Sequence, residues 1–351
     1  MNWENNVRKV VPYTPGEQPK CGRMIKLNTN ECPYPPAPGV KKLLESENYE
    51  ELRLYPSADA GELVEALAEY YKVKPTEVFV GVGSDDVISM AFLTFFNSDK
   101  PILFPDITYS FYPVWADVYK IGYKTKALDE NFRIKKEDYL EPNGGIIIPN
   151  PNAPTGVLES LDDIEEIIKS NPDSVVMIDE AYIDFAEEGT SALSLVDKYD
   201  NLLVIRTFSK SRAMAGLRVG FAIGNEKLIK YLNDVKYSVN SYTMNRPSLV
   251  LGVEAVKDDE YFKATLKKII NTRERMKKEL TALGFSFPDS KSNFVFATHK
   301  TAAAEDIFKY LRSKQIYVRF FKQPRIDNYL RITVGTDEET DELIKELKSF
   351  L

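Results

Sequence analysis

The sequence predicts an α/β protein whose sheet is largely parallel and is covered by helices on both faces. Between about residues 60 and 225, short apolar runs alternate with segments whose apolar residues recur at helical spacing. Runs such as "GGIIIPN" and "SVVMIDE" are continuously apolar, as expected of strands that are buried on both sides. Residues 226–284 have long helical patterns with little strand signal, and a mixture of strand-like and helical segments follows. We therefore expect a smaller α+β domain after the large one.

Taken in order, the elements of the large domain begin with a helix over "GELVEALAEYYKV" and a strand over "EVFVGVGS", followed by the helical "DDVISMAFLTFF". "PILFPD" is strand-like, "DITYSFYPVWADVYKI" mostly helical, and "GYKTKALD" strand-like again. The helix over "LDDIEEIIK" has a start signal in Ser160, with Asp163 three residues later. "NLLVIRTFS" and "RVGFAIG" are further apolar strands. The chain divides into an N-terminal segment (1–30) that joins the small domain, a large domain (31–245) and a small domain (246–351).

Composition disfavours several classes of function. The net charge of -7 argues against a nucleic-acid partner, because phosphate binding needs a basic surface. The N-terminus lacks the apolar core of a signal peptide, and the run at residues 87–96 is too short to span a bilayer, so we expect a cytoplasmic protein without a membrane partner. Two cysteines, Cys21 and Cys32, predict no disulfide framework. Because His299 is the single histidine, we expect neither a multi-histidine metal site nor a Ser-His-Asp triad.

Ligands bind open α/β sheets beyond the carboxyl ends of the strands, so the residues after each strand are the candidates for a site. "GVGSDD" has Asp86 where a dinucleotide-binding fingerprint has its third glycine, which excludes that fingerprint. Glycines that lead into a helix still offer N–H groups to a single phosphate. A tight turn with Ser84 as the helix cap is the alternative.

Three other strands also end in polar or turn-forming residues. "PNAPTG" after "GGIIIPN" indicates only a loop. Asp179 and Tyr182 follow "SVVMI", and a carboxylate at the end of a buried strand needs a partner, which a structural salt bridge could also supply. Lys210 follows "NLLVIRT", with Arg212 and Arg218 after it, and is either an imine-forming nucleophile or a surface or phosphate-binding lysine.

Together these strand ends offer a phosphate cradle, an acid, a phenol and a lysine with an arginine nearby. Pyridoxal phosphate requires this set: a lysine that holds it as a Schiff base, a carboxylate that keeps its ring nitrogen protonated, donors for its phenolate oxygen and a cationic phosphate pocket.

The motifs closely resemble those of the fold-type I pyridoxal-phosphate-dependent aminotransferases. They span almost the whole chain: "RLYPSADAGELVEALAEYY", "GVGSDD", "PNAPTG", "IDEAYIDF", "TFSKSRAMAGLRVGF" and "YLRITVG". "IKLNTNECPYPPAP" and "DEAYIDF" look most like the histidinol-phosphate aminotransferase branch. The resemblance implies a mainly parallel seven-stranded sheet between helices, a smaller α+β domain and a homodimer.

The resemblance also implies a role for each matched cofactor-binding position. Lys210 holds the cofactor and moves the proton between the substrate Cα and the cofactor C4′. Asp179 pairs with the ring nitrogen, Tyr182 hydrogen-bonds the phenolate oxygen, and Tyr109 stacks on the ring. The phosphate is held by a further group: Ser84, Asp85, Thr207, Ser209, Arg218 and, from the neighbouring subunit, Tyr55.

For the substrate, the resemblance implies that Arg331 binds a carboxylate through a bidentate contact. Arg319 is the candidate for a second anionic group such as a phosphate, and Asn30 lies in the segment that borders the pocket. As ordinary residues, Tyr55 and Tyr109 would be half-buried aromatics and Arg319 would form a surface ion pair.

Two positions depart from the family pattern. Ala153 stands where an asparagine usually supports the phenolate oxygen, so either Asn152 takes over that contact or Tyr182 carries it alone. Cys32 replaces an asparagine of the segment that borders the substrate pocket.

The expected activity is a ping-pong transamination that converts histidinol phosphate and 2-oxoglutarate to imidazole acetol phosphate and glutamate, in histidine biosynthesis. An aromatic amino acid aminotransferase and a threonine-phosphate decarboxylase on the same scaffold remain alternatives. A non-catalytic pyridoxal-phosphate-binding module is the alternative from a different class.

Overall fold

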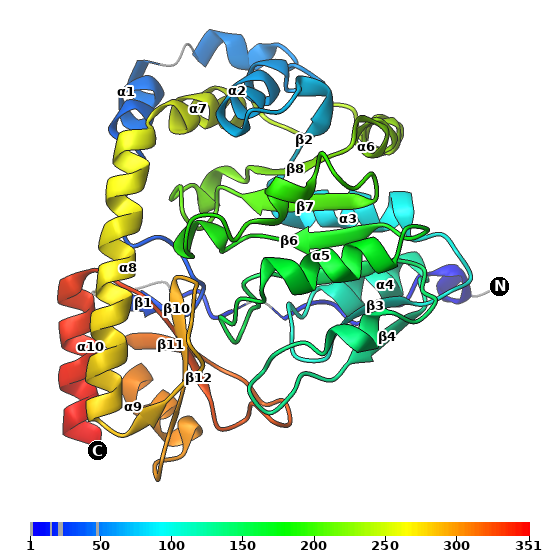
Figure 1. Ribbon diagram of the computed structural model, residues 1–351. Helices are drawn as coiled ribbons and strands as arrows, with labels where there is room; N and C mark the ends of the chain where they lie inside the picture. Colours follow the sequence, from blue (N-terminus) through cyan, green and yellow to red (C-terminus); the bar gives the residue numbers. More distant parts are fainter. Residues whose placement is uncertain (1–2, 15, 20–23, 47–48) are drawn as a thin grey trace.

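The computed structural model describes residues 3–14, 16–19, 24–46 and 49–351, so Cys21 lies outside the described residues. These residues form two sheets, each with its own helices (Figure 1).

The larger sheet has seven strands, and all its pairings are parallel except those of β8, which runs antiparallel to both neighbours. In sheet order the strands are β2 (Val78–Gly81), β8 (Gly220–Gly224), β7 (Leu202–Thr207), β6 (Val176–Asp179), β5 (Ile146–Pro149), β3 (Ile102–Pro105) and β4 (Tyr123–Lys126). The predicted fold class, including a mainly parallel seven-stranded sheet, is confirmed.

Helices cover both faces of this sheet because successive strand residues point to opposite sides. Ile146 and Ile148 pack in one core, and Ile147, between them, packs in the other. The helices on the first face are α1 (Pro38–Ser46), α2 (Gly61–Tyr71), α5 (Leu161–Ser170) and α7 (Arg246–Lys257). Those on the second face are α3 (Gly83–Phe95), α4 (Tyr112–Tyr119) and α6 (Glu226–Val239). Burial on two sides explains why these strands are continuously apolar in sequence.

The smaller sheet has five strands: β1 (Ile25–Leu27), β11 (Ile316–Phe320), β12 (Leu330–Thr333), β10 (Phe294–His299) and β9 (Phe285–Ser286). It packs with α8 (Asp259–Ala282), α9 (Ala304–Ser313) and α10 (Asp337–Phe350) around a separate core (Figure 1). β1 pairs in parallel with β11, so the N-terminal segment contributes an edge strand to this sheet.

One element is shorter than the sequence predicts, and one agrees in detail. α7 begins after residue 245, and its buried side chains pack in a core of the seven-stranded sheet; the domain boundary expected at this residue stays a prediction. The helix expected over residues 106–121 spans only 112–119, with Pro113 in its first turn. Ser160 caps α5 as predicted, because its side chain accepts a hydrogen bond from the Asp163 backbone.

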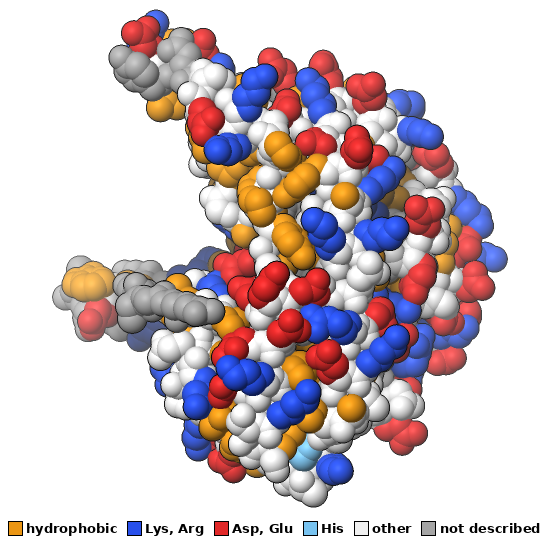
Figure 2. Space-filling model, turned by 90° about the vertical axis from the view of Figure 1, so that its left-hand side faces the viewer, with side chains coloured by type: hydrophobic (Ala, Val, Ile, Leu, Met, Phe, Trp, Pro, Cys, Tyr) orange, Lys and Arg blue, Asp and Glu red, His pale blue; other side chains and the backbone are white. Residues whose placement is uncertain are grey.

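Acidic and basic side chains are interspersed over the face that carries α1, α8 and α10 (Figure 2). Mixed charges of this kind produce no concentrated positive field for a polyanion over the described part of that face. None of the helices in the described ranges has both the length and the apolar character needed to cross a membrane.

Candidate active site

The carboxyl ends of the large sheet's strands surround a cavity of about 170 Å³ that contains most of the predicted cofactor-binding residues. The predicted residues that line it are Ser84, Asp85, Tyr109, Asp179, Tyr182, Thr207, Ser209, Lys210 and Arg218. A second cavity of about 150 Å³ shares Thr29, Tyr109, Ala153, Tyr182 and Lys210 with the first and extends to the small domain. The two cavities are therefore adjacent halves of one site.

Lys210 and Asp179 reach this site from neighbouring strands. Asp179 is the last residue of β6, and Lys210 follows the end of β7 by three residues. The Lys210 Nζ donates a hydrogen bond to the Thr29 carbonyl oxygen at 3.2 Å and lies 5.8 Å from the centre of the Tyr182 ring. The lysine amine therefore stands where the two cavities meet.

Asp179 is a buried carboxylate whose partners in the described part of the chain are uncharged. Its Oδ2 accepts a hydrogen bond from the Tyr112 hydroxyl at 2.8 Å, and its Oδ1 accepts one from the Ala181 backbone at 3.2 Å. Burial, with smaller contributions from Asp85 and Glu180, raises the Asp179 pKa from 3.8 to about 6. A cation in the cavity would reverse this shift, because it favours the ionised carboxylate.

One end of the first cavity is built to hold an anion. Arg218 Nη1 donates to the Ser209 Oγ at 3.3 Å, and its Nη2 forms an ion pair with Asp85 at 3.2 Å. Ser84 and Asp85 lie in the first turn of α3, where free N–H groups and the helix dipole favour a negative group.

Close packing around Arg218 explains the glycine before Ser84. A Cβ on Gly83, whose φ is +82°, would lie 2.5 Å from the Arg218 Nη2. Glycine is therefore favoured where this arginine crosses the start of α3, mainly because other residues rarely adopt this φ.

Tyr109 lines both cavities and donates a hydrogen bond to the Asp85 carboxylate at 2.8 Å. Burial and this carboxylate raise the Tyr109 pKa well above its ordinary value, so the phenol stays protonated. Its predicted contact with the cofactor ring stays a prediction.

The second cavity contains two arginines at facing positions of the small sheet. Arg319 of β11 and Arg331 of β12 are directly paired across the antiparallel ladder, an arrangement that is unfavourable for like charges. Burial lowers the Arg331 pKa, with a smaller contribution from Arg319, and the Arg331 Nε has no hydrogen-bond partner among the described residues. The pair therefore favours an anionic ligand in this cavity.

Asn30 also lines the second cavity, but its amide nitrogen donates to the Tyr182 hydroxyl at 2.9 Å. Asn152 is not among the described lining residues of either cavity, since its amide donates to the Ile107 carbonyl and to the Thr155 hydroxyl. Of the two arrangements left open at Ala153, the geometry favours the one in which Tyr182 acts without Asn152.

Tyr55 is the other predicted residue outside these cavities. Its side chain is 82% exposed and stacks on Tyr242 with ring centroids 4.7 Å apart. A role at the cofactor phosphate therefore needs a second subunit.

Sequence reasoning missed several residues of the site. Tyr112, which holds Asp179, lies three residues after Tyr109 in the same motif, and this spacing was the available signal. Thr29 and Tyr13 come from the N-terminal segment, and Glu31 directly follows it. The approach of all three to the site depends on tertiary packing.

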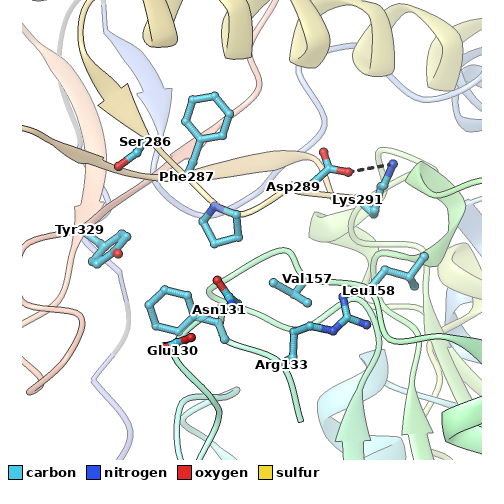
Figure 3. A pocket seen from close by; sticks show the side chains of 12 residues that line it. Glu130, Asn131, Arg133, Val157, Leu158, Ser286, Phe287, Asp289, Lys291 and Tyr329 are labelled. Carbon is cyan, nitrogen blue, oxygen red and sulfur yellow. Dashed lines mark ion pairs between the residues drawn. The ribbon is translucent and has the colours of Figure 1, made fainter.

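A larger cavity of about 530 Å³ lies between residues 130–133 and 157–158 on one side and residues 286–289, Lys291 and Tyr329 on the other (Figure 3). The described residues that line it include none of the predicted site residues. Three of its charged side chains already form ion pairs: Asp289 with Lys291, and Arg133 with Glu159. Size alone therefore does not mark the site.

The arrangement around Lys210 fits pyridoxal phosphate. The buried Asp179 has no cationic neighbour to bond in the described structure, and the protonated ring nitrogen of the cofactor is such a partner. Lys210 lines the same cavity, and Ser209, Arg218 and the start of α3 form the anion-binding end.

Comparison with known proteins agrees with this fit. Residues 22–347 match the family model of the class I and II aminotransferases. The chain is 52% identical over 344 residues to a histidinol-phosphate aminotransferase of Brachyspira hyodysenteriae, covering 98% of this chain and 97% of the relative. It is 50% identical to one from Lactococcus lactis subsp. cremoris, covering 100% and 98% of the two chains.

A similar fold is found in the crystal structure of a histidinol-phosphate aminotransferase from Sinorhizobium meliloti in complex with pyridoxal-5'-phosphate. The TM-score is 0.85 at 22% identity, over 93% of this chain and 92% of that one. The predicted family, fold and cofactor are thus confirmed. The chain belongs to the class I and II aminotransferases, which depend on pyridoxal phosphate, and within them to the histidinol-phosphate aminotransferase branch.

Proposed function

We propose that this aminotransferase moves the amino group of histidinol phosphate to 2-oxoglutarate, giving imidazole acetol phosphate and glutamate in histidine biosynthesis. The observation that carries the proposal is the identity of about half of all residues, over essentially the full chain, with relatives named for histidinol phosphate. The paired arginines of the second cavity support it, because both the phosphate of one substrate and the carboxylates of the other need cationic partners.

We assign to the cofactor-side residues the roles that their positions around the first cavity support. When bound, pyridoxal phosphate supplies a protonated ring that takes up the electron pair left at the substrate carbon. Lys210 would take the proton from the substrate Cα and pass it to the cofactor C4′, as the acid–base group of both half-reactions. Asp179 would keep the ring nitrogen protonated, with its carboxylate held in place by Tyr112 and Ala181. Tyr109 would stack on the ring.

Substrate binding uses the arginine pair. Arg331 binds the carboxylate of the amino donor or acceptor, and Arg319 takes the second anionic group, which includes the substrate phosphate. Asn30 borders the same cavity. Like charges at 319 and 331 repel each other until an anion binds, so the pair favours ligands with concentrated negative charge.

We propose further that the enzyme is a cytoplasmic homodimer in which Tyr55 reaches the cofactor phosphate of the neighbouring subunit. The exposed apolar side chains around Tyr55 support this, since Leu52, Leu54 and Tyr242 are each about half exposed.

Two measurements test the function. Turnover of histidinol phosphate with 2-oxoglutarate is compared with that of phenylalanine and threonine phosphate, and a preference for either alternative substrate contradicts the proposal. Borohydride reduction of the cofactor-loaded protein, followed by peptide mapping, should find the cofactor attached to Lys210. Attachment to another lysine, or no visible chromophore after pyridoxal phosphate is added, contradicts the assigned site.

A further inference from the structure

Asn30 joins the N-terminal segment, the small sheet and the active-site tyrosine. It is 1% exposed and has a φ of 58°, a left-handed conformation that asparagine tolerates better than most residues. Its backbone oxygen accepts a hydrogen bond from the Asn293 side chain at 3.0 Å. The Asn293 side chain therefore fixes the position of the Asn30 backbone.

The hydrogen bonds around Asn30 fix the orientation of its amide. The Asn30 backbone N–H donates to the Thr333 Oγ1 at 3.1 Å, and that hydroxyl in turn donates to the Asn30 Oδ1 at 3.0 Å. Thr333 is buried, and among the described residues its hydroxyl hydrogen has no acceptor other than the Asn30 Oδ1, so the Asn30 oxygen faces Thr333. The Nδ2 must then face the Tyr182 hydroxyl, 2.9 Å away.

This orientation controls the hydrogen of Tyr182. An NH₂ group only donates, so the Tyr182 oxygen accepts from Asn30 and its own hydrogen remains available to another acceptor. Tyr182 lines both cavities beside Lys210, whereas position 153, an alanine, offers no side-chain donor there.

We infer that Asn30 is a positioning residue that orients the Tyr182 hydroxyl to donate to the phenolate oxygen of the cofactor. The inference rests on the proposed function only in taking the cavity to hold pyridoxal phosphate. It differs from substrate binding, because it predicts an effect in the absence of substrate.

Asn30→Asp is the isosteric test, since a carboxylate cannot donate and instead accepts the Tyr182 hydrogen. The phenolate then loses its donor and holds the neighbouring proton of the lysine–cofactor linkage more strongly. We expect the pH midpoint of the visible absorption change, measured without substrate, to rise by about one unit or more. Asn131→Asp adds the same charge at an exposed position and should leave the midpoint unchanged.

Asn30→Ala covers the case in which the buried charge of Asn30→Asp prevents folding. It should raise the midpoint by a few tenths of a unit to about one unit, and Ala153→Asn in the same chain should reverse the rise. In the Tyr182→Phe background, the Asn30→Ala substitution should have no further effect on the midpoint. The dissociation constant of pyridoxal phosphate, measured by equilibrium dialysis, should rise a few-fold in Asn30→Ala and not in Asn131→Asp.

The outcomes separate the two proposals. If the wild-type protein binds no chromophore after pyridoxal phosphate is added, the proposed function is contradicted. Normal cofactor binding with the same midpoint in the wild type and in Asn30→Ala overturns the inference about Asn30 alone, as does an additive effect in the Tyr182→Phe background.

Discussion

At the scale of single residues, Lys210 has the most specific expected effect. Lys210→Ala removes the group that moves the substrate proton, while the anion-binding end and Asp179 remain in place. We expect transamination to fall by at least about 10⁴-fold, and pyridoxal phosphate to remain bound without the covalent linkage. Single-turnover kinetics and cofactor binding by fluorescence check this. Substantial activity in Lys210→Ala would show that another base acts here.

Asp179 makes the stability of the cofactor-free protein depend on pH. Its folded pKa of about 6 is above the ordinary 3.8, so between these values the folded protein binds more protons than the unfolded chain. The contribution of Asp179 to the free energy of unfolding therefore falls as the pH rises from about 4 to about 6. Above about pH 7 this contribution no longer changes with pH. Relative to wild type, Asp179→Asn should become more stable over that window, by about 3 kcal/mol at most.

Denaturant unfolding of the two cofactor-free proteins at several pH values measures this difference. Comparing variant with wild type cancels the titration of carboxylates that both proteins share. Curves that stay parallel from pH 4 to 7 would show that Asp179 ionises normally. Activity should be lost in Asp179→Asn at every pH, because an amide does not hold a proton on the ring nitrogen.

At the scale of elements, a buried ion network aligns the loop of Lys210 with the end of β6. Arg206 of β7 pairs with Glu180 at 2.8 Å and with Asp184 at 3.1 Å. Asp184 accepts a hydrogen bond from Ser211, the neighbour of Lys210, at 2.5 Å. The network thus connects the residues next to Asp179 with those next to Lys210.

Breaking this network from one side should destabilise the fold strongly. Arg206→Met leaves the buried Glu180 carboxylate without a cationic partner, and we expect a loss of about 3–5 kcal/mol in the free energy of unfolding. Adding Glu180→Gln to the Arg206→Met variant should restore part of the lost free energy of unfolding. Lys230→Met, which breaks the exposed pair with Asp234, is the control and should change stability by less than about 1 kcal/mol. Equal effects of the two single variants in urea unfolding would argue against the network.

The elements also show what can be predicted from sequence. Lys210, Asp179 and Ser84 were predictable because each follows an apolar strand, and parallel strands bring their carboxyl ends to one edge. The contact of Asn30 with Tyr182 was not, since 152 positions separate the two residues and only the packing of two sheets brings them together. Asn152 was assigned to the pocket by its neighbours in the motif, whereas the hydrogen bonds of its amide to Ile107 and Thr155 depend on how the loop packs.

At the scale of the whole molecule, the position of Tyr55 predicts sites shared between subunits. In one chain Tyr55 is exposed and lies outside both cavities, whereas the motif in which it occurs implies contact with a phosphate. If each subunit of a dimer places its Tyr55 in the active site of the other, then each site has Lys210 from one chain and Tyr55 from the other. Two impaired variants, one substituted at Lys210 and one at Tyr55, should then complement each other when they form a mixed dimer.

Co-expression of Lys210→Ala and Tyr55→Ala chains tests this directly. In a mixed dimer, one site receives both substitutions and the other receives neither. Random pairing makes about half of all dimers mixed, so about a quarter of the sites should be fully active, although each parent dimer is impaired. Tandem purification with two different tags should raise this fraction to about half. Mixed dimers no more active than the better parent would place Tyr55 in the function of its own chain, and a monomer in light scattering would contradict the shared site altogether.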